Sequence, residues 1–126
     1  MSDLHLGPIG QISLLVTDTE RSVQWYRDVL GLPHLYTFGD LAFFDCGGTR
    51  LFLSKPEDGI FKPSSVIYFT VGDINQAYEE LKNRKVEFAA APHLIFRHPS
   101  GMEEWMAFFK DPDGQLLGLM SQVSAS

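Results

Sequence analysis

A motif that occurs twice constrains the fold of this chain more than any other feature of its sequence. Val16-Thr17-Asp18, before a helical stretch that ends near Leu30, matches Val71-Gly72-Asp73, before a helical stretch that ends near Arg84. The two copies lie 55 positions apart. Self-similarity at a fixed offset is the signature of a repeated supersecondary unit. The chain is therefore expected to contain two modules of one kind.

The offset between the two copies increases toward the end of the chain. Residues 42–45 resemble residues 107–110, which lie 65 positions later. Residues 48–53 align with residues 114–119, which lie 66 positions later. The increase indicates an insertion in the second copy at residues 91–104, which we expect to form a loop over the mouth of a pocket.

Each copy carries the signals of an amphipathic helix. Thr17-Asp18-Thr19-Glu20 has the spacing of a capping box, and Gly31 can adopt the left-handed conformation that ends a helix. In the second copy Asp73 is the expected cap, and apolar residues recur at helical spacing along residues 74–81. Each helix is therefore predicted to pack one apolar face on a sheet.

The segments next to the helices have the patterns of strands. Apolar residues alternate along residues 11–16, which predicts a strand whose even positions face the helix. Gly47-Gly48 predicts a hairpin that places Asp45 beside Arg50. An ion pair with Asp45 is the expected role of this arginine, and the binding of an anionic ligand is the alternative.

The predicted fold class is α+β, with two tandem βαβββ modules. The modules are placed at about residues 9–55 and 65–122 of a single domain that covers residues 1–126. Each sheet would have one face covered by its helix and one face free. Two such sheets side by side would form an open half-barrel, whose concave face is suited to a ligand.

Composition argues against several classes of function. The net charge of −6, without a dense Lys/Arg cluster, opposes a nucleic-acid or acidic-membrane partner and favours a neutral or cationic ligand. Cys46 is the only cysteine, which favours a reducing, cytoplasmic location without an internal disulfide. No apolar run is long enough to span a bilayer, and residues 1–10 lack the pattern of a signal peptide.

Three stretches of the chain resemble the vicinal oxygen chelate superfamily of glyoxalases, bleomycin-resistance proteins and extradiol dioxygenases. Residues 16–32 are similar to the first strand and helix of that family. Residues 69–74 are similar to the opening of its second module, and residues 108–117 to its closing hairpin. The resemblance extends from Ile9 to about Gln122 and implies the same two-module fold. It also implies a homodimer, which exposed sheet edges favour.

Family members that use a metal hold a divalent ion with His, Gln or Glu at four inward positions. The internal repeat maps these positions to Gln11 and Val66 on the first strands, and to Phe52 and Gly118 on the last strands. Only Gln11 carries a donor, and one amide oxygen does not hold a transition metal. The metal site is predicted to be lost and no cofactor is expected. A divalent Ni, Zn, Fe or Mn ion is the alternative.

Side chains that share the inward parity of the strands form the predicted ligand-binding face. They are Gln11, Ser13, Phe43, Arg50, Phe52, Val66, Tyr68, Met106, Phe108, Gly118 and Met120. Their aromatic and methionine content favours an apolar or aromatic ligand, although such a stripe is also typical of a core. Gly118 is expected either to deepen the floor of the pocket or to let an aromatic group lie flat on the sheet.

Three hypotheses about function follow from these features. The first is a metal-free binding module of the bleomycin-resistance kind for a small, partly aromatic or apolar molecule. The alternative is a metal-dependent lyase, isomerase or dioxygenase that uses the 91–104 insertion, with His93, Glu103 and Glu104 as candidate catalytic residues. The third is a relative with a closed pocket and a regulatory or structural role.

Overall fold

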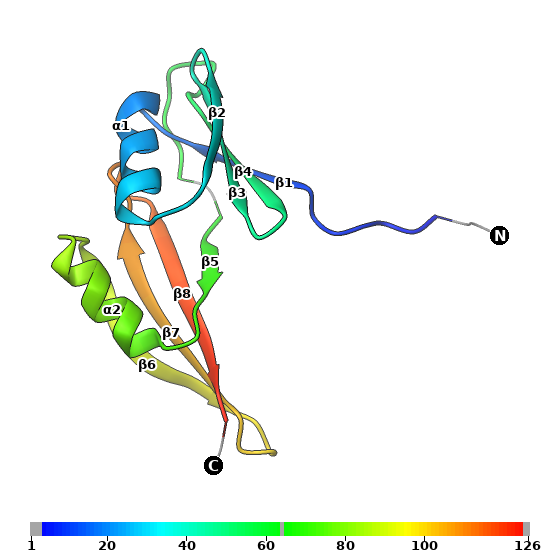
Figure 1. Cartoon of the computed structure of the whole chain (residues 1–126), viewed down its shortest axis with the longest axis vertical. Helices are drawn as coiled ribbons and strands as arrows, with labels where there is room; N and C mark the ends of the chain where they lie inside the picture. Colours follow the sequence, from blue (N-terminus) through cyan, green and yellow to red (C-terminus); the bar gives the residue numbers. More distant parts are fainter. Residues whose placement is uncertain (1–3, 64, 125–126) are drawn as a thin grey trace. The chain divides into compact units, whose positions relative to one another are not determined.

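The computed structural model describes residues 4–63 and 65–124. The chain is divided into two compact units, Met1–Pro63 and Ser64–Ser126, and each unit has one four-stranded sheet (Figure 1). The two predicted modules fall within these two units. Among the described residues, no helix has the length and apolar character needed to cross a bilayer.

The first unit is a βαβββ module with its helix on one face of the sheet (Figure 1). The strand order is β1-β4-β3-β2, with β1 parallel to β4 and the other neighbours antiparallel. The elements are β1 (Gln11–Leu15), α1 (Thr19–Gln24), η1 (Trp25–Val29), β2 (His34–Phe38), β3 (Leu41–Cys46) and β4 (Thr49–Ser54).

The first helix begins one residue later than a cap at Thr17 would require. Asp18 is the cap, and its carboxylate accepts a hydrogen bond from the backbone N–H of Arg21 at 3.1 Å. A carboxylate at this position satisfies a free N–H of the first turn, as the hydroxyl of a capping box would. The helix continues as the π-helical segment η1, in which Leu30 N–H donates to the carbonyl of Trp25. Gly31, with a φ of 73°, follows the end of this segment.

The second unit repeats the module with longer strands. Its strand order is β5-β8-β7-β6, with β5 parallel to β8 and the other neighbours antiparallel. The elements are β5 (Ile67–Thr70), α2 (Ile74–Asn83), β6 (Phe88–Arg97), β7 (Glu103–Lys110) and β8 (Leu116–Val123).

Helix α2 is closed at both ends by hydrogen bonds. The carboxylate of Asp73 accepts from the backbone N–H of Gln76 at 3.1 Å, so the predicted cap is confirmed. At the other end Val86 N–H donates to the carbonyl of Leu81, across Lys85, which has a φ of 66°. This is the Schellman arrangement, with lysine at the position where glycine is usual.

Each unit has its core between the helix and the face of the sheet that the helix covers. The buried side chains on these faces are Leu14, Ala42, Phe44, Leu51 and Leu53 in the first unit, and Ala107, Phe109, Leu117 and Leu119 in the second. Tyr26 of η1 and Ile74 of α2 are the helical residues most deeply buried among the core side chains. The alternation that predicted which strand positions face the helix is therefore correct for the strand centres.

The insertion at residues 91–104 is not a loop, which corrects the expectation from the sequence. Strand β6 continues to Arg97 and β7 begins at Glu103, so the insertion lengthens a hairpin. His98 N–H donates to the carbonyl of Met102 and closes the turn. The apolar run at residues 94–96 can continue the strand ladder, with irregular register between β6 and β7.

Candidate functional site

The helix-free face of the first sheet brings together all five residues predicted for the first module. The strand register places Ser13, Phe52 and Phe43 in one row across β1, β4 and β3. Gln11 and Arg50 form the next row. Residues paired across neighbouring strands point to the same face of a sheet, so the two rows share one surface.

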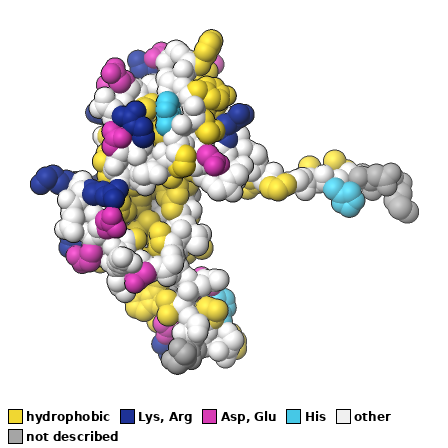
Figure 2. Space-filling view, viewed as in Figure 1, with side chains coloured by type: hydrophobic (Ala, Val, Ile, Leu, Met, Phe, Trp, Pro, Cys, Tyr) yellow, Lys and Arg dark blue, Asp and Glu magenta, His cyan; other side chains and the backbone are white. Residues whose placement is uncertain are grey.

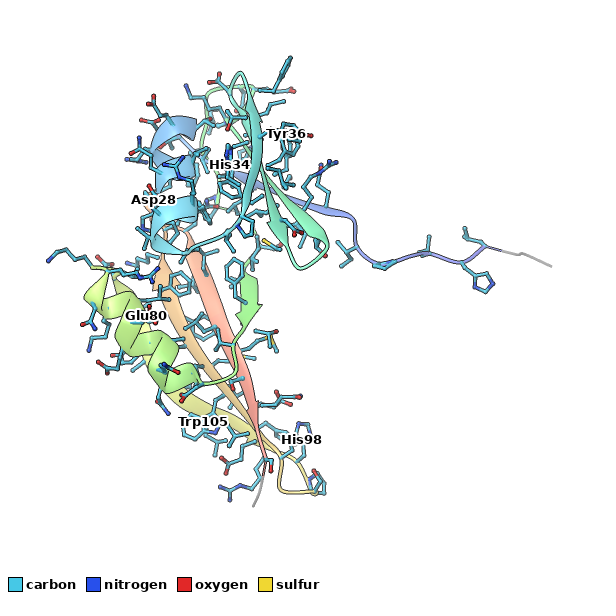
Figure 3. The ribbon with its side chains drawn as sticks, viewed as in Figure 1. Asp28, His34, Tyr36, Glu80, His98 and Trp105 are labelled. Atoms are coloured by element: carbon cyan, nitrogen blue, oxygen red, sulfur yellow. The ribbon has the colours of Figure 1, made fainter. Side chains whose placement is uncertain are left out.

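The first row continues on β2 with Tyr36, a residue that the sequence analysis missed. Tyr36 pairs with Phe43, and Figure 3 shows it on the side of β2 away from α1. The rings of Tyr36 and Phe43 are stacked with centroids 4.6 Å apart, and those of Phe43 and Phe52 with centroids 4.9 Å apart. A register shift between His34 and Tyr36 breaks the alternation that would have revealed it.

Arg50 does not form the expected ion pair with Asp45. Its Nε donates to Oε1 of Gln11 at 2.8 Å, and its guanidinium carbon lies 5.2 Å from the centroid of the Phe43 ring. Asp45 is opposite Arg50 in the register, but its carboxylate accepts from the backbone N–H of Gly48 at 2.9 Å. The left-handed backbone at this hairpin turns that N–H toward Asp45, so the carboxylate of Asp45 stabilises the turn.

The helix-free face of the second sheet carries the residues predicted for the second module, apart from Val66. Tyr68, Gly118 and Phe108 form one row, and Met120 and Met106 belong to the next. Val66 is half-buried and lies one residue before β5, just outside the strand on which the sequence placed it.

The ring of Tyr68 lies against Gly118 and covers it. A Cβ atom at position 118 would lie 2.7 Å from Cδ2 of Tyr68, a separation at which one of the two must move. The expectation that Gly118 deepens a pocket floor is therefore wrong, and the other expectation, an aromatic group lying flat on the sheet, is met by a side chain of the protein itself. Glycine permits this close approach because it has no side chain.

The candidate catalytic residues of the insertion are divided between the two faces of the second sheet. Glu104 shares the helix-free face with Met106, whereas its neighbour Glu103 points to the opposite face because side chains alternate along a strand. Figure 3 shows the same division for His98 and Trp105. The ring of His93 lies beside Phe108, and its Nδ1 is 2.7 Å from the carbonyl oxygen of Ala91.

Hydrogen bonds hold the pKa of each glutamate below its ordinary value. The pKa of Glu104 is lowered by hydrogen bonds from His98 and Gln122, each at 2.8 Å. The pKa of Glu103 is lowered by hydrogen bonds from Trp105 and Arg97. Both carboxylates are thus stabilised in their charged form.

The residues at the four positions implied by the family resemblance do not fit a divalent ion. Gln11 is the one donor among them, and its amide oxygen already accepts from Arg50. Phe52 is stacked on Phe43, and Gly118 is covered by the Tyr68 ring. Within residues 4–63 and 65–124, no group of three or more His, Cys, Asp or Glu side chains is arranged to hold a metal.

Two βαβββ modules with helix-free sheet faces define a class of α+β protein, and comparisons with known proteins identify the family. The model of the Glyoxalase/Bleomycin resistance protein/Dioxygenase superfamily matches residues 8–119. The chain therefore belongs to this superfamily. It is also 30% identical over 131 residues to the uncharacterized protein YraH of Bacillus subtilis strain 168, covering 90% of this chain and 97% of that protein.

Solved structures share the fold at low sequence identity. A superfamily member from Sphaerobacter thermophilus superposes with a TM-score of 0.74 at 24% identity, covering 94% of this chain and 99% of the other. A lactoylglutathione lyase from Agrobacterium tumefaciens superposes with a TM-score of 0.63 at 23% identity, covering 92% and 94% of the two chains. Because fold does not define activity, these similarities show the fold of this chain and not its function.

Proposed function

We propose that this chain is a binding module of the bleomycin-resistance kind that captures a small, partly aromatic or apolar molecule without a metal ion. The support comes from the helix-free sheet faces, which carry aromatic and methionine side chains that are only half-buried or exposed. Apolar walls with few polar groups are typical of small-molecule sites. These side chains are Tyr36, Phe43, Phe52, Tyr68, Met106, Phe108 and Met120.

The donor chemistry supports the metal-free part of this proposal. Metal-dependent members of the family rely on a divalent ion as Lewis acid and on a nearby base that moves the proton. Phe52 and Gly118 supply neither a ligand nor a base. A neutral amide that already binds a guanidinium, as Gln11 does, is a poor ligand for a transition metal.

The proposal includes a cytoplasmic homodimer. Exposed apolar side chains on the edge strand β2 favour association, since Leu35, Tyr36 and Phe38 are 49%, 48% and 75% exposed. Light scattering on the purified chain should give a mass of about twice 14.2 kDa. A mass of one chain at micromolar concentration would contradict the dimer and leave the binding function untouched.

Elemental analysis combined with a thermal-shift screen tests the absence of a functional metal. The purified chain is expected to contain far less than one equivalent of Ni, Zn, Fe or Mn, and these ions should not raise its melting temperature. A ligand that binds only the folded state must raise that temperature. Gln11→Ala is the matched control and should behave as the wild type does. One equivalent that resists a chelator would refute the proposal.

A neutral aromatic probe tests the binding function directly. Titration of the isotope-labelled chain with 2-naphthamide is expected to shift backbone resonances of the helix-free strand positions, and to leave those of α2 unchanged. No saturable shift on either sheet would contradict the binding function.

The pair formed by His98 and Glu104 supports an enzyme as the second candidate. His98 Nε2 lies 2.8 Å from a carboxylate oxygen of Glu104 on the helix-free face, an arrangement that can hold and move a proton. If the chain has lyase or isomerase activity, His98→Gln should lower kcat strongly and His93→Gln should not. Equal activity of the two variants would exclude the pair from catalysis.

A further inference from the structure

We propose that the helix-free face of the first unit binds an aromatic carboxylate, with Arg50 and Gln11 holding the anion and Phe52 stacking on the ring. This inference rests on the proposed binding function and names the class of its ligand. It differs from the expectation drawn from net charge, which favours a neutral or cationic molecule. Local geometry carries the inference, because a bound molecule interacts mainly with the groups that it touches.

The aromatic row of the first unit ends at a small side chain. The rings of Tyr36, Phe43 and Phe52 are stacked across three neighbouring strands, and Ser13 occupies the next place in that row on β1. Ser13 is exposed and too short to cover the outer side of Phe52. A flat ring above Ser13 would therefore extend the stack by one member, at the separation that offset aromatic pairs prefer.

The cation beside this place is not neutralised by the protein. Its one hydrogen-bond partner is the uncharged amide of Gln11, and within residues 4–63 and 65–124 Arg50 forms no ion pair. The nearest carboxylate in the register, Asp45, is held by the N–H of Gly48 in the hairpin turn. Arg50 is thus an exposed cation beside an apolar surface, and an aromatic ring bound on that surface would shield its hydrogen bonds from water.

The donors that remain on these two side chains match a carboxylate. The hydrogen bond from Nε to Gln11 and the contact with Phe43 orient the guanidinium plane. The N–H groups of the two terminal nitrogens of Arg50 therefore remain available to a ligand. Paired N–H groups of arginine bind a carboxylate in bidentate fashion. The amide nitrogen of Gln11 supplies a further donor one strand away, on the row next to Ser13. Figure 2 shows that basic and hydrophobic side chains are both present on the surface of this unit.

Two probes of the same shape separate charge recognition from ring binding. We expect 2-naphthoate to bind the full chain about tenfold more tightly than neutral 2-naphthamide, because charge-assisted hydrogen bonds are about twice as strong as neutral ones. Arg50→Gln should remove this preference and retain the weaker binding of 2-naphthamide. Arg27→Gln is the matched control, since Arg27 is an exposed arginine of the same unit that pairs with Asp28.

Resonance shifts and a substitution at Ser13 test whether the probes bind at this place on the first unit. Backbone resonances of β1 and β4 should shift on addition of 2-naphthoate. Ser13→Phe should weaken the binding of both probes, because the new ring fills the place above position 13. Equal affinity for the two probes, or a preference that survives Arg50→Gln, would overturn this inference and leave the binding function standing. Shifts confined to the second unit would also overturn it. Failure of both probes to bind would refute the inference and the proposed function together.

Discussion

Adding one methyl group at Gly118 should destabilise the protein, and the same group should stabilise it once Tyr68 is removed. The Cβ atom of Gly118→Ala would lie 2.7 Å from Cδ2, 3.0 Å from Cε2 and 3.3 Å from Cγ of Tyr68. The first of these separations is shorter than a Cβ atom tolerates, so the Tyr68 ring is expected to move away from the sheet.

The size of the effect follows from what the ring loses. Tyr68 is 42% exposed, so more than half of its surface is covered. Exposing about 60–100 Å² of apolar surface costs about 1.5–2.5 kcal/mol at about 25 cal/mol per Å². Alanine in place of glycine in a strand raises the free energy of unfolding by about 0.5–1 kcal/mol, because glycine loses more backbone freedom on folding. The free energy of unfolding of Gly118→Ala should therefore be lower than that of the wild type by about 0.5–2 kcal/mol.

A double-mutant cycle measured by urea unfolding isolates the contact. In the Tyr68→Ala background the clash is absent, so Gly118→Ala should raise the free energy of unfolding by about 0.5–1 kcal/mol. The coupling between the two positions is then about 2 kcal/mol, well above the roughly 0.3–0.5 kcal/mol expected for independent sites. Stabilisation of the wild type by Gly118→Ala, or additive effects in the cycle, would refute the close packing of Tyr68 on Gly118.

Two further predictions concern the second unit. In thermal melts, Lys85→Gly should raise the free energy of unfolding by about 1 kcal/mol, because a φ of 66° strains lysine and not glycine. The control Glu79→Gly, inside α2, should lower the free energy of unfolding by about the same amount. A lower stability of Lys85→Gly would contradict the left-handed backbone at this position. His98→Ala should raise the pKa of Glu104 toward its ordinary value of 4.5 in a carboxyl NMR titration, whereas His93→Ala should not. Because the pKa of Glu104 is lower in the folded state, its contribution to stability is present above pH 4.5 and is lost as the pH falls through the lower, folded-state pKa. An identical titration of Glu104 in the wild type and in His98→Ala would argue against this hydrogen bond.

The internal repeat and strand parity were sufficient to predict the two βαβββ modules and most of their helix-free faces. Parity is reliable wherever a strand is regular, so the row of Ser13, Phe52 and Phe43 follows from the sequence alone. It fails at the register shift before Tyr36, where one extra residue exchanges the two faces. The loop expected at the insertion overlooks Ile95 and Phe96, which are residue types that favour strands and which lie in β6.

The partners of polar side chains could not be predicted from the pattern. The register correctly places Asp45 opposite Arg50, yet proximity in the register does not decide which hydrogen bonds form. A backbone N–H in the turn competes for the carboxylate of Asp45, and a neighbouring amide competes for the guanidinium of Arg50. Such competition depends on side-chain rotamers and backbone dihedral angles that strand patterns do not encode.

The two modules use one large and one small residue at equivalent positions, in opposite order. Ser13 and Tyr68 are equivalent in the repeat, as are Phe52 and Gly118. The first module therefore has the small residue on its first strand and the large residue on its last strand, and the second module has the reverse. In the second module the large ring folds over the small residue and occupies the place itself. In the first module Phe52 stacks toward Phe43 instead, and the place above Ser13 stays open next to Arg50. The exchange therefore leaves the two units with different surfaces, and a molecule that needs both a flat apolar contact and a cation is expected to select the first.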